Sequence, residues 1–218
     1  MAPEFGNFLK GKVERAAMEY KKGPLTPELV DKTWQILWGE WGKRIGVSFR
    51  DIPSCDRTPE ELALLQKENK AVLLIPDILY TEEGLILLGN MFPKMKIWAA
   101  KNENEIKNEV NKGGCIDIEK VSDSPNRGIA GYQATELFRQ QGREGQRLAT
   151  YIIGSQLSKL SVRQYFDEIT TSYLLGSNLG GNIVTAHRSS SGDLIISSNL
   201  NPLGFSHVGF RSEGRKKA

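Results

Sequence analysis

Cysteine and histidine are scarce in this chain of 218 residues, which contains two of each. Cys55 and Cys115 are too few for a disulfide framework, and without a second cysteine pair they have no zinc-site pattern. A reducing compartment is the natural setting for such a chain. We therefore expect a cytoplasmic protein that has neither a disulfide scaffold nor a metal or cofactor.

Long apolar segments are also lacking. The longest runs, 71–76 and 85–88, are far shorter than the roughly 20 residues that a helix needs to cross a bilayer. The first seven residues lack the charged-then-apolar pattern of a signal peptide. Charge is nearly balanced, with a formal net charge of +3, so an anionic partner is permitted without being required. We expect no association with a membrane.

The first firm helix signal begins at Thr26. Thr26 suits the N-cap position, and Pro27 suits the first helical turn. Trp34, Trp38 and Trp41 then recur on one helical face. Such a stripe is either part of the core or a stacking platform for bases or sugars. We favour the core, because apolar residues at helical spacing most often face the interior.

Residues 47–118 alternate between short apolar runs and polar, helix-like stretches. A capping box at Thr58–Glu61 predicts a helix that ends near Lys70. Strands are predicted at 47–52, 71–75, 96–99 and 115–118, and further helices at 81–91 and 102–111. This order permits a parallel sheet without requiring one, since the helices are short and the crossovers tight. No glycine-rich phosphate loop follows any of these strands.

The last third of the chain carries the clearest structural signals. Helices are predicted at 134–141 and 149–160, and a second capping box at Ser161–Gln164 predicts another that ends at Gly176. Residues 182–188 and 194–198, separated by a polar loop, predict a β-hairpin. The remainder is rich in glycine and basic residues, so we expect it to be flexible.

These elements predict an α+β fold of mixed helices and short strands, with a small α/β layer followed by a unit of two helices and a β-hairpin. The boundary between the two units is expected at 122–131, where Ser, Pro, Asn and Gly cluster. The predicted division is a flexible N-terminal segment at 1–24, a mixed α/β subdomain at 25–121, a helical and β-hairpin subdomain at 122–208, and a basic flexible tail at 209–218.

Few residues are candidates for catalysis. Asp167 and Glu168 form the densest acidic cluster of the last third, and paired carboxylates can act as general acid and base or hold a divalent metal. Together with His187 they are the candidates for a hydrolytic or metal-assisted enzyme. Adjacent helical residues point about 100° apart, so the carboxylates need not converge. A solvated acidic turn and an ordinary strand histidine are the alternative interpretations.

Arginines are the second group of candidates. If the basic residues of the last third gather on one face, they can bind the phosphates of RNA, DNA or another anionic polymer. Against this interpretation, Glu136 and Glu144 are interleaved with them, and no nucleic-acid-binding motif is present. The candidate ligand-binding residues are Arg143, Arg147, Arg163, Arg188 and Arg211.

Several segments of the last third are distinctive in sequence: 142–148, 151–156, 158–160, 165–168, 174–177 and 209–214. Together they resemble uncharacterised hypothetical proteins of candidate-phyla bacteria, mainly over residues 126–214. That family has no assigned activity. The resemblance therefore implies a small soluble bacterial protein and transfers no catalytic residue to this chain.

The function that these observations favour is that of a non-enzymatic binding or interaction protein with an unidentified partner. The main reason is that no catalytic constellation is evident in the sequence. Binding of an anionic polymer such as nucleic acid is the first alternative. A hydrolytic or metal-assisted enzyme is the second, so enzymatic activity remains an open question.

Overall fold

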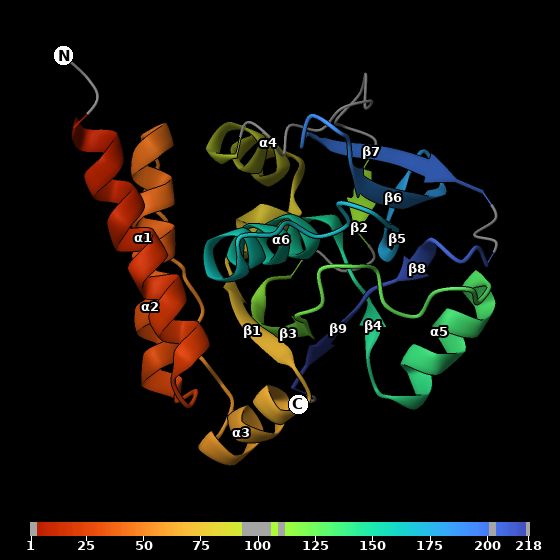
Figure 1. The fold of residues 1–218 in the computed structure, drawn as a ribbon, viewed down its shortest axis with the longest axis horizontal. Coiled ribbons are helices and arrows are strands. Elements are labelled where there is room, and N and C mark those ends of the chain that lie inside the picture. The colour runs from red at the N-terminus through yellow and green to blue at the C-terminus, as the bar shows by residue number, and fades with distance from the viewer. Residues whose placement is uncertain (1–3, 93–105, 109–111, 201–203, 217–218) are drawn as a thin grey trace.

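A computed structural model describes residues 4–92, 106–108, 112–200 and 204–216 of the chain and confirms the predicted α+β class. Two helices, α1 and α2, stand side by side along one flank, and α6 lies across the middle of the molecule (Figure 1). The described helices are α1 (Glu4–Lys22), α2 (Pro27–Ile45), α3 (Pro59–Lys67), the 3-10 helix η1 (Asp77–Tyr80), α4 (Glu82–Met91), α5 (Gly131–Gln140) and α6 (Leu148–Val162). None of them is long and apolar enough to span a bilayer.

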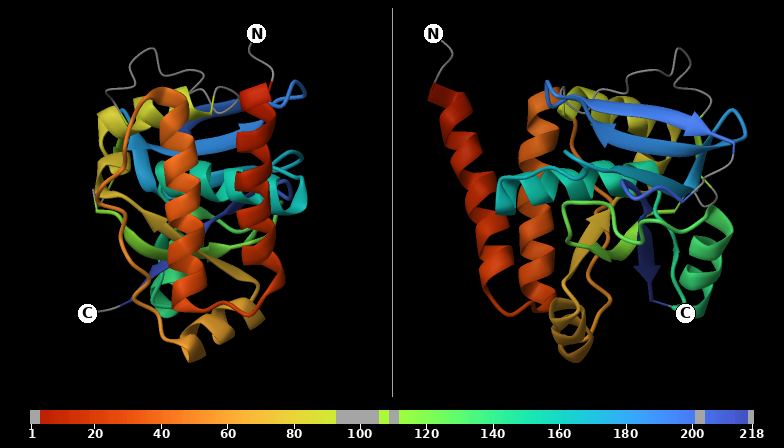
Figure 2. Two further views of the ribbon diagram at one scale, coloured as in Figure 1. Left: turned by 90° about the vertical axis from the view of Figure 1, so that its left-hand side faces the viewer. Right: turned by 45° about the vertical axis from the view of Figure 1, so that its right-hand side comes forward.

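The strands form two sheets, seen from two further directions in Figure 2. The first sheet has the order β1-β3-β9-β4, with β1 (Lys70–Ile75), β3 (Gly114–Glu119), β9 (Ser212–Arg215) and β4 (Glu144–Gly145). The second has the order β2-β5-β6-β7, with β2 (Ile106–Asn108), β5 (Thr171–Leu179), β6 (Asn182–Arg188) and β7 (Leu194–Asn199). A further strand, β8 (Val208–Phe210), pairs in parallel with β5.

Strands β1 and β3 pair in antiparallel fashion, with Lys70 opposite Glu119 and Ile75 opposite Gly114. The parallel sheet that the order of strands and helices permitted is therefore not formed by these two strands. The predicted hairpin is confirmed as β6 and β7, whose register runs from Arg188 opposite Leu194 to Ile183 opposite Asn199. One cluster of buried side chains extends from α1 to β7 and so crosses the boundary predicted at 122–131, which itself stays a prediction.

The tryptophan stripe of α2 is buried, as predicted, and it also covers the free edge of β1. The three indole rings are fully buried and pack against one another with centroids 5.2–6.2 Å apart. The Trp34 indole N–H donates to the Val72 carbonyl at 3.0 Å, and that of Trp38 donates to the Leu74 carbonyl at 2.7 Å. Because an exposed strand edge invites pairing with other chains, these bonds protect β1.

Helix α1 corrects the expectation of a flexible segment at residues 1–24 for the part of it that the structure describes. Val13, Ala17 and Tyr20 are buried against the main core, so the polar appearance of this stretch concealed a narrow apolar face. The Tyr20 hydroxyl accepts from the Val72 N–H at 2.7 Å and donates to the Val72 carbonyl at 2.8 Å. This pair of bonds fixes α1 to the same strand edge that α2 covers.

Two further predictions for the first half need correction. Residues 47–52 contain no strand. The helix predicted at 102–111 is wrong at 106–108, which form β2; the rest of that helix and the strand predicted at 96–99 lie outside the described residues. The capping box at Thr58 is confirmed by both of its hydrogen bonds, although its helix ends at Lys67 instead of Lys70.

The helix predicted from Val162 to Gly176 is also wrong. Helix α6 continues to Val162, and its C-cap is Arg163, whose backbone is left-handed with φ of 65°. The Ser161 hydroxyl bonds back to the Leu157 carbonyl at 2.8 Å and therefore does not cap a new helix. Residues 163–170 form turns that lead into β5.

The flexible tail predicted at 209–218 is likewise corrected over its described residues, 209–216, because β8 and β9 lie in the sheets. The Glu213 carboxylate of β9 is fully buried and pairs with Arg147, whose Nε donates to Oε1 at 2.7 Å and whose backbone N–H donates to Oε2 at 3.1 Å. The Arg147 guanidinium also lies over the Tyr80 ring, 4.1 Å from its centroid. A buried carboxylate of this kind is stable only with such compensation.

We expect Trp38→Phe to destabilise the protein by about 1–3 kcal/mol more than Trp41→Phe. Both changes remove the same volume, but only Trp38 donates a hydrogen bond, since the Trp41 indole N–H has no partner within the described residues. Chemical denaturation of the two variants measures the difference. Equal losses would show that the bond to the edge of β1 contributes nothing.

We expect Glu213→Gln to cost about 3–5 kcal/mol, because it leaves the buried Arg147 guanidinium without its counter-charge. Glu136→Gln is the matched control, since Glu136 pairs with Arg139 on the exposed face of α5. Equilibrium unfolding should show no measurable change for the control. A comparably small effect at both positions would contradict the importance of the buried pair.

Candidate functional site

The structure places the predicted catalytic residues apart. The Asp167 carboxylate is buried and bonds to Arg211, Thr170 and Ser172 at 2.7–3.3 Å. Glu168 is exposed and accepts a hydrogen bond from the Tyr165 backbone N–H at 3.0 Å. The two carboxylates therefore do not converge on a common point.

His187 faces away from this cluster. It lies on β6 opposite Ile195, and its neighbour Arg188 stacks on the Tyr165 ring at 3.9 Å. Since adjacent strand residues point to opposite faces of a sheet, Arg188 takes the face toward Tyr165 and His187 takes the other. The structure does not join His187, Asp167 and Glu168 into one catalytic arrangement.

The candidate arginines do not form a basic face either. Arg147 and Arg211 are buried in ion pairs, and the Arg211 guanidinium also donates to the carbonyls of Val121 and Ser122 at 3.0 and 2.9 Å. Arg143 bonds to Asp117 and Ser212, and Arg188 donates to the Gly192 carbonyl at 2.8 Å. Arg163 is exposed and pairs with Glu14 at 3.2 Å.

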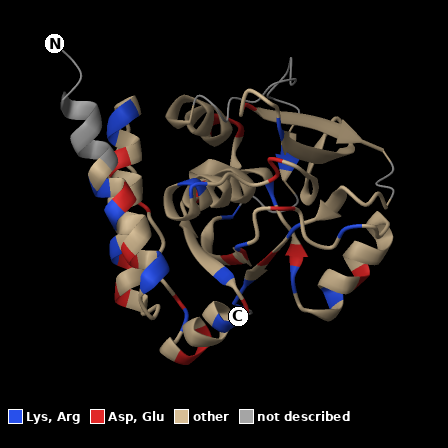
Figure 3. Cartoon of the chain, in the orientation of Figure 1, with Lys and Arg blue, Asp and Glu red and all other residues tan. Residues whose placement is uncertain are grey.

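Basic and acidic residues are also interleaved along the helices and strands in Figure 3. Binding of an anionic polymer needs several unpaired cations on one surface. The candidate arginines have internal or acidic partners instead. Nucleic-acid binding therefore stays a prediction that these residues do not support.

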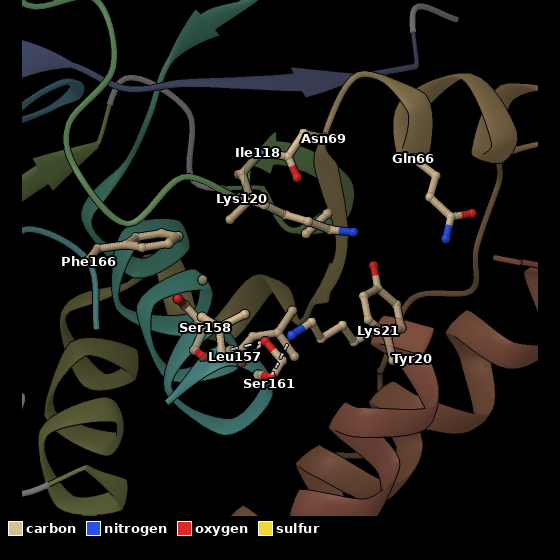
Figure 4. Close-up of a pocket in the computed structure, with 13 residues that line it drawn as sticks. Tyr20, Lys21, Gln66, Asn69, Ile118, Lys120, Leu157, Ser158, Ser161 and Phe166 are labelled. Atoms are coloured by element: carbon tan, nitrogen blue, oxygen red, sulfur yellow. Dashed lines mark hydrogen bonds between the residues drawn. The ribbon is translucent and has the colours of Figure 1, made fainter. Parts of the chain in front are cut away.

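A cavity of about 290 Å³ is the most distinctive site in the described part of the chain. It lies between the end of α1, the start of β1, the end of β3 and the second half of α6 (Figure 4). Its apolar wall consists of Ala71, Ile118, Leu157, Val162 and Phe166, and its polar lining of Tyr20, Lys21, Gln66, Asn69, Lys120, Ser158 and Ser161. Gly154 completes the lining and allows α6 to approach β3, since a Cβ there would lie 2.4 Å from Ile118 Cδ1.

Two lysines enter this cavity from different elements, as Figure 4 shows. Lys120 directly follows β3, and its backbone N–H donates to the Asn69 carbonyl at 3.0 Å, which fixes the base of the side chain. Lys21 comes from the last turn of α1, and its ammonium donates to the Ser161 carbonyl at 3.3 Å. Cations are favoured there, because carbonyls at the end of a helix carry partial negative charge.

The Lys120 ammonium is electrostatically uncompensated. Within the described residues it makes no hydrogen bond or ion pair, and no Asp or Glu lines the cavity. Burial lowers the pKa of Lys120 from its ordinary value, and the positive charge of Lys21 lowers it further. Burial and the charge of Lys21 both disfavour the charged form of Lys120. An anion bound in the cavity would stabilise that charged form.

The polar groups around the lysines are mostly occupied. The Gln66 side chain bonds to the backbone of Gly23 and Leu25, and the hydroxyls of Ser158 and Ser161 donate to backbone carbonyls. Burial raises the pKa of Tyr20 well above its ordinary range, so its hydroxyl stays protonated. Among the described residues, the Lys120 ammonium is thus unused, and the Lys21 ammonium, which donates only to the Ser161 carbonyl, has donor hydrogens left for a ligand.

Four other cavities among the described residues are each lined by charges of both signs. The one lined by Asp117, Glu119, Glu68, Lys70 and Arg143 has internal ion pairs, including Lys70 with Glu68 at 2.6 Å. The one beside η1 is lined by three acidic side chains and two basic ones, Asp51, Asp77, Glu83, Arg50 and Lys112. In the described residues, no group of three or more His, Cys, Asp or Glu side chains is placed to hold a metal ion.

No family model, curated protein or solved structure matches this chain. Lys21 and Lys120 were not among the candidates from the sequence, because neither belongs to a motif. The only local signal was the position of Lys120 immediately after a predicted strand.

We expect Lys120→Met to stabilise the protein by roughly 0.5 kcal/mol at pH 7, a modest value because the half-buried charge is partly screened by solvent. The pKa of Lys120 in the folded state lies below the ordinary 10.5. The charged ammonium therefore destabilises the folded state by its full amount at pH values below the folded-state pKa. This destabilisation disappears as the pH rises through 10.5, where the unfolded chain also loses the proton. Unfolding free energies across this range measure the effect.

The control for this comparison is Lys32→Met, which removes an exposed lysine on α2 that does not line the cavity. It corrects for the titration of other groups at high pH. A loss of stability at pH 7 in the Lys120 variant, with the control unchanged, would contradict the electrostatic account of the site.

Proposed function

We propose that this protein binds a small organic anion in the cavity between α1, β1, β3 and α6. The observation that carries the proposal is the presence of Lys21 and Lys120 in a cavity that no carboxylate lines. A carboxylate or phosphate group would lie between the two ammonium groups. The proposal agrees with the expectation of a non-enzymatic binding protein and gives its partner a chemical class.

The size and lining of the cavity define the rest of the ligand. A dry cavity of about 150 Å³ accepts a benzene ring, so about 290 Å³ suits a ring or branched chain that carries one acidic group. The apolar part would contact Ile118, Leu157 and Phe166. Each 100 Å² of apolar surface removed from water would then contribute about 2.5 kcal/mol to binding.

Charge contributes the specificity. An ammonium and an anion about 4 Å apart attract by up to roughly 4 kcal/mol at an effective dielectric of about 20, before the cost of desolvation is subtracted. Burial has already removed part of the solvent from Lys120, so part of this cost is paid in the folded protein. A neutral ligand of the same shape lacks this attraction.

The alternatives have less support from the described residues. A hydrolytic enzyme would need Asp167, Glu168 and His187 to converge, and an anionic polymer would need unpaired arginines on one face. Neither arrangement is present among the residues described. Membership of a bacterial family and a cytoplasmic location remain part of the proposal and rest on the sequence alone.

The proposal is tested with 3-phenylpropionate, which joins an aromatic ring to one carboxylate, and with its neutral amide as the matched probe. At about 100 times its dissociation constant, the carboxylate should stabilise the fold by about 2.7 kcal/mol, or roughly 5–10 °C in Tm. The amide should have little effect. Inorganic phosphate serves as a third probe for the anion site without its apolar part.

Lys120→Met should reduce the affinity for the carboxylate at least about tenfold, whereas Lys32→Met should leave it unchanged. Isothermal titration and thermal unfolding give the two readouts. Equal binding of acid and amide, or unchanged affinity in the Lys120 variant, would refute an anion site. If neither phenylpropionate nor phosphate at millimolar concentration stabilises the protein, the proposed ligand class is wrong.

A further inference from the structure

The two cysteines of the chain lie side by side although 60 positions of sequence separate them. The loop between α2 and α3 runs along β3 at this point. The Arg57 guanidinium pairs with Asp117 at 3.1 Å, and two residues earlier on both segments the Cys55 and Cys115 thiols are close enough for each to shift the pKa of the other. These contacts place residues 55–57 beside residues 115–117 of β3.

Both cysteines are held in place by backbone bonds. The Cys55 N–H donates to the Asp31 carboxylate at 2.7 Å, which ties the loop to α2. Cys115 lies on β3 opposite Leu74 of β1. The backbone N–H groups of Arg57 and Asp56 act on the two thiols and lower the pKa of Cys55 and Cys115, respectively. The contact between the thiols is therefore built into the fold.

The two thiols differ in environment. Cys115 is 6% exposed, whereas Cys55 is only partly buried and can be reached from solvent. The hydrogen bond from the Cys115 thiol lowers the pKa of Cys55, and the same bond, together with burial, raises the pKa of Cys115. Cys55 is thus the thiol that ionises, and Cys115 is the one that stays protonated beside it.

We propose that Cys55 and Cys115 form a peroxide-reactive thiol pair, in which Cys55 is oxidised first and Cys115 then closes a disulfide. This pair is independent of the anion site, because neither cysteine lines the lysine cavity. In the structure both cysteines are free thiols. Their number excludes a disulfide scaffold but not a single reversible bond.

The oxidant is hydrogen peroxide or an organic hydroperoxide. The Cys55 thiolate attacks one peroxide oxygen, the O–O bond breaks, and the departing oxygen takes a proton and leaves as water or an alcohol. This step gives a sulfenic acid at Cys55. The Cys115 sulphur then attacks the Cys55 sulphur, the S–O bond breaks, and the hydroxyl leaves with the Cys115 proton as water.

The pair is tested by treating the full chain with one equivalent of hydrogen peroxide, blocking free thiols with iodoacetamide and mapping peptides without reduction. The expected product is an intramolecular link between the peptides containing Cys55 and Cys115, with two hydrogens lost. Dithiothreitol should restore both thiols. Two alkylated cysteines after treatment, or only intermolecular links between chains, would overturn the proposal.

Two variants assign the roles of the cysteines. In Cys115→Ser the sulfenic acid has no partner, so dimedone should label Cys55. In Cys55→Ser the remaining Cys115 should be oxidised at least about tenfold more slowly than Cys55 in the other variant. Labelling of Cys115 at the same rate would overturn the assignment. The disulfide map of the unmodified chain remains decisive if either variant folds poorly.

Discussion

The buried ion pair between Arg147 and Glu213 is the constraint on which the arrangement of the two sheets depends. An unpaired charge in the interior costs several kcal/mol, so β9 is stable only where the Arg147 guanidinium meets it. Arg211, two residues earlier, is held by Asp167 in the same way. These pairs fasten the last described strands to the start of α6 and to the turn before β5, and the two sheets meet there.

The pairing of buried charges elsewhere in the protein explains why the lysine cavity is unusual. Most buried or half-buried charges of the last third have a partner of opposite sign nearby, and their contribution is structural. Lys120 follows β3, the strand that also carries the paired Asp117, yet its own ammonium has no partner within the described residues. Because the buried Arg147 and Arg211 are paired with carboxylates, the unpaired ammonium of Lys120 in a cavity without acidic lining residues is the place where an external anion would supply the missing charge.

The sequence was a reliable guide where the signal was local. The tryptophan stripe, the capping box at Thr58 and the hairpin of β6 and β7 each depend on residues a few positions apart. It misled where a helical spacing occurred by coincidence: residues 162–173 fit one helical face, yet Ile169 is 80% exposed and Arg163 has a left-handed backbone. The glycine-rich last segment suggested flexibility, whereas Gly209 lies so close to the Pro125 carbonyl that a Cβ would come within 2.1 Å.

The sequence by itself therefore determined the α+β class, the buried face of α2, several helix starts and the hairpin, because these follow from periodicity and capping over short distances. Only the tertiary structure decided which charges are paired, that Lys21 and Lys120 share a cavity, and that Cys55 meets Cys115. Each of these contacts joins segments far apart in sequence, and the cavity and the cysteine contact form where α1, α6 and the 46–58 loop pack around the antiparallel pair of β1 and β3. Long-range pairing of this kind leaves no periodic trace in the sequence, since its energy comes from partners that the chain brings together only when it folds.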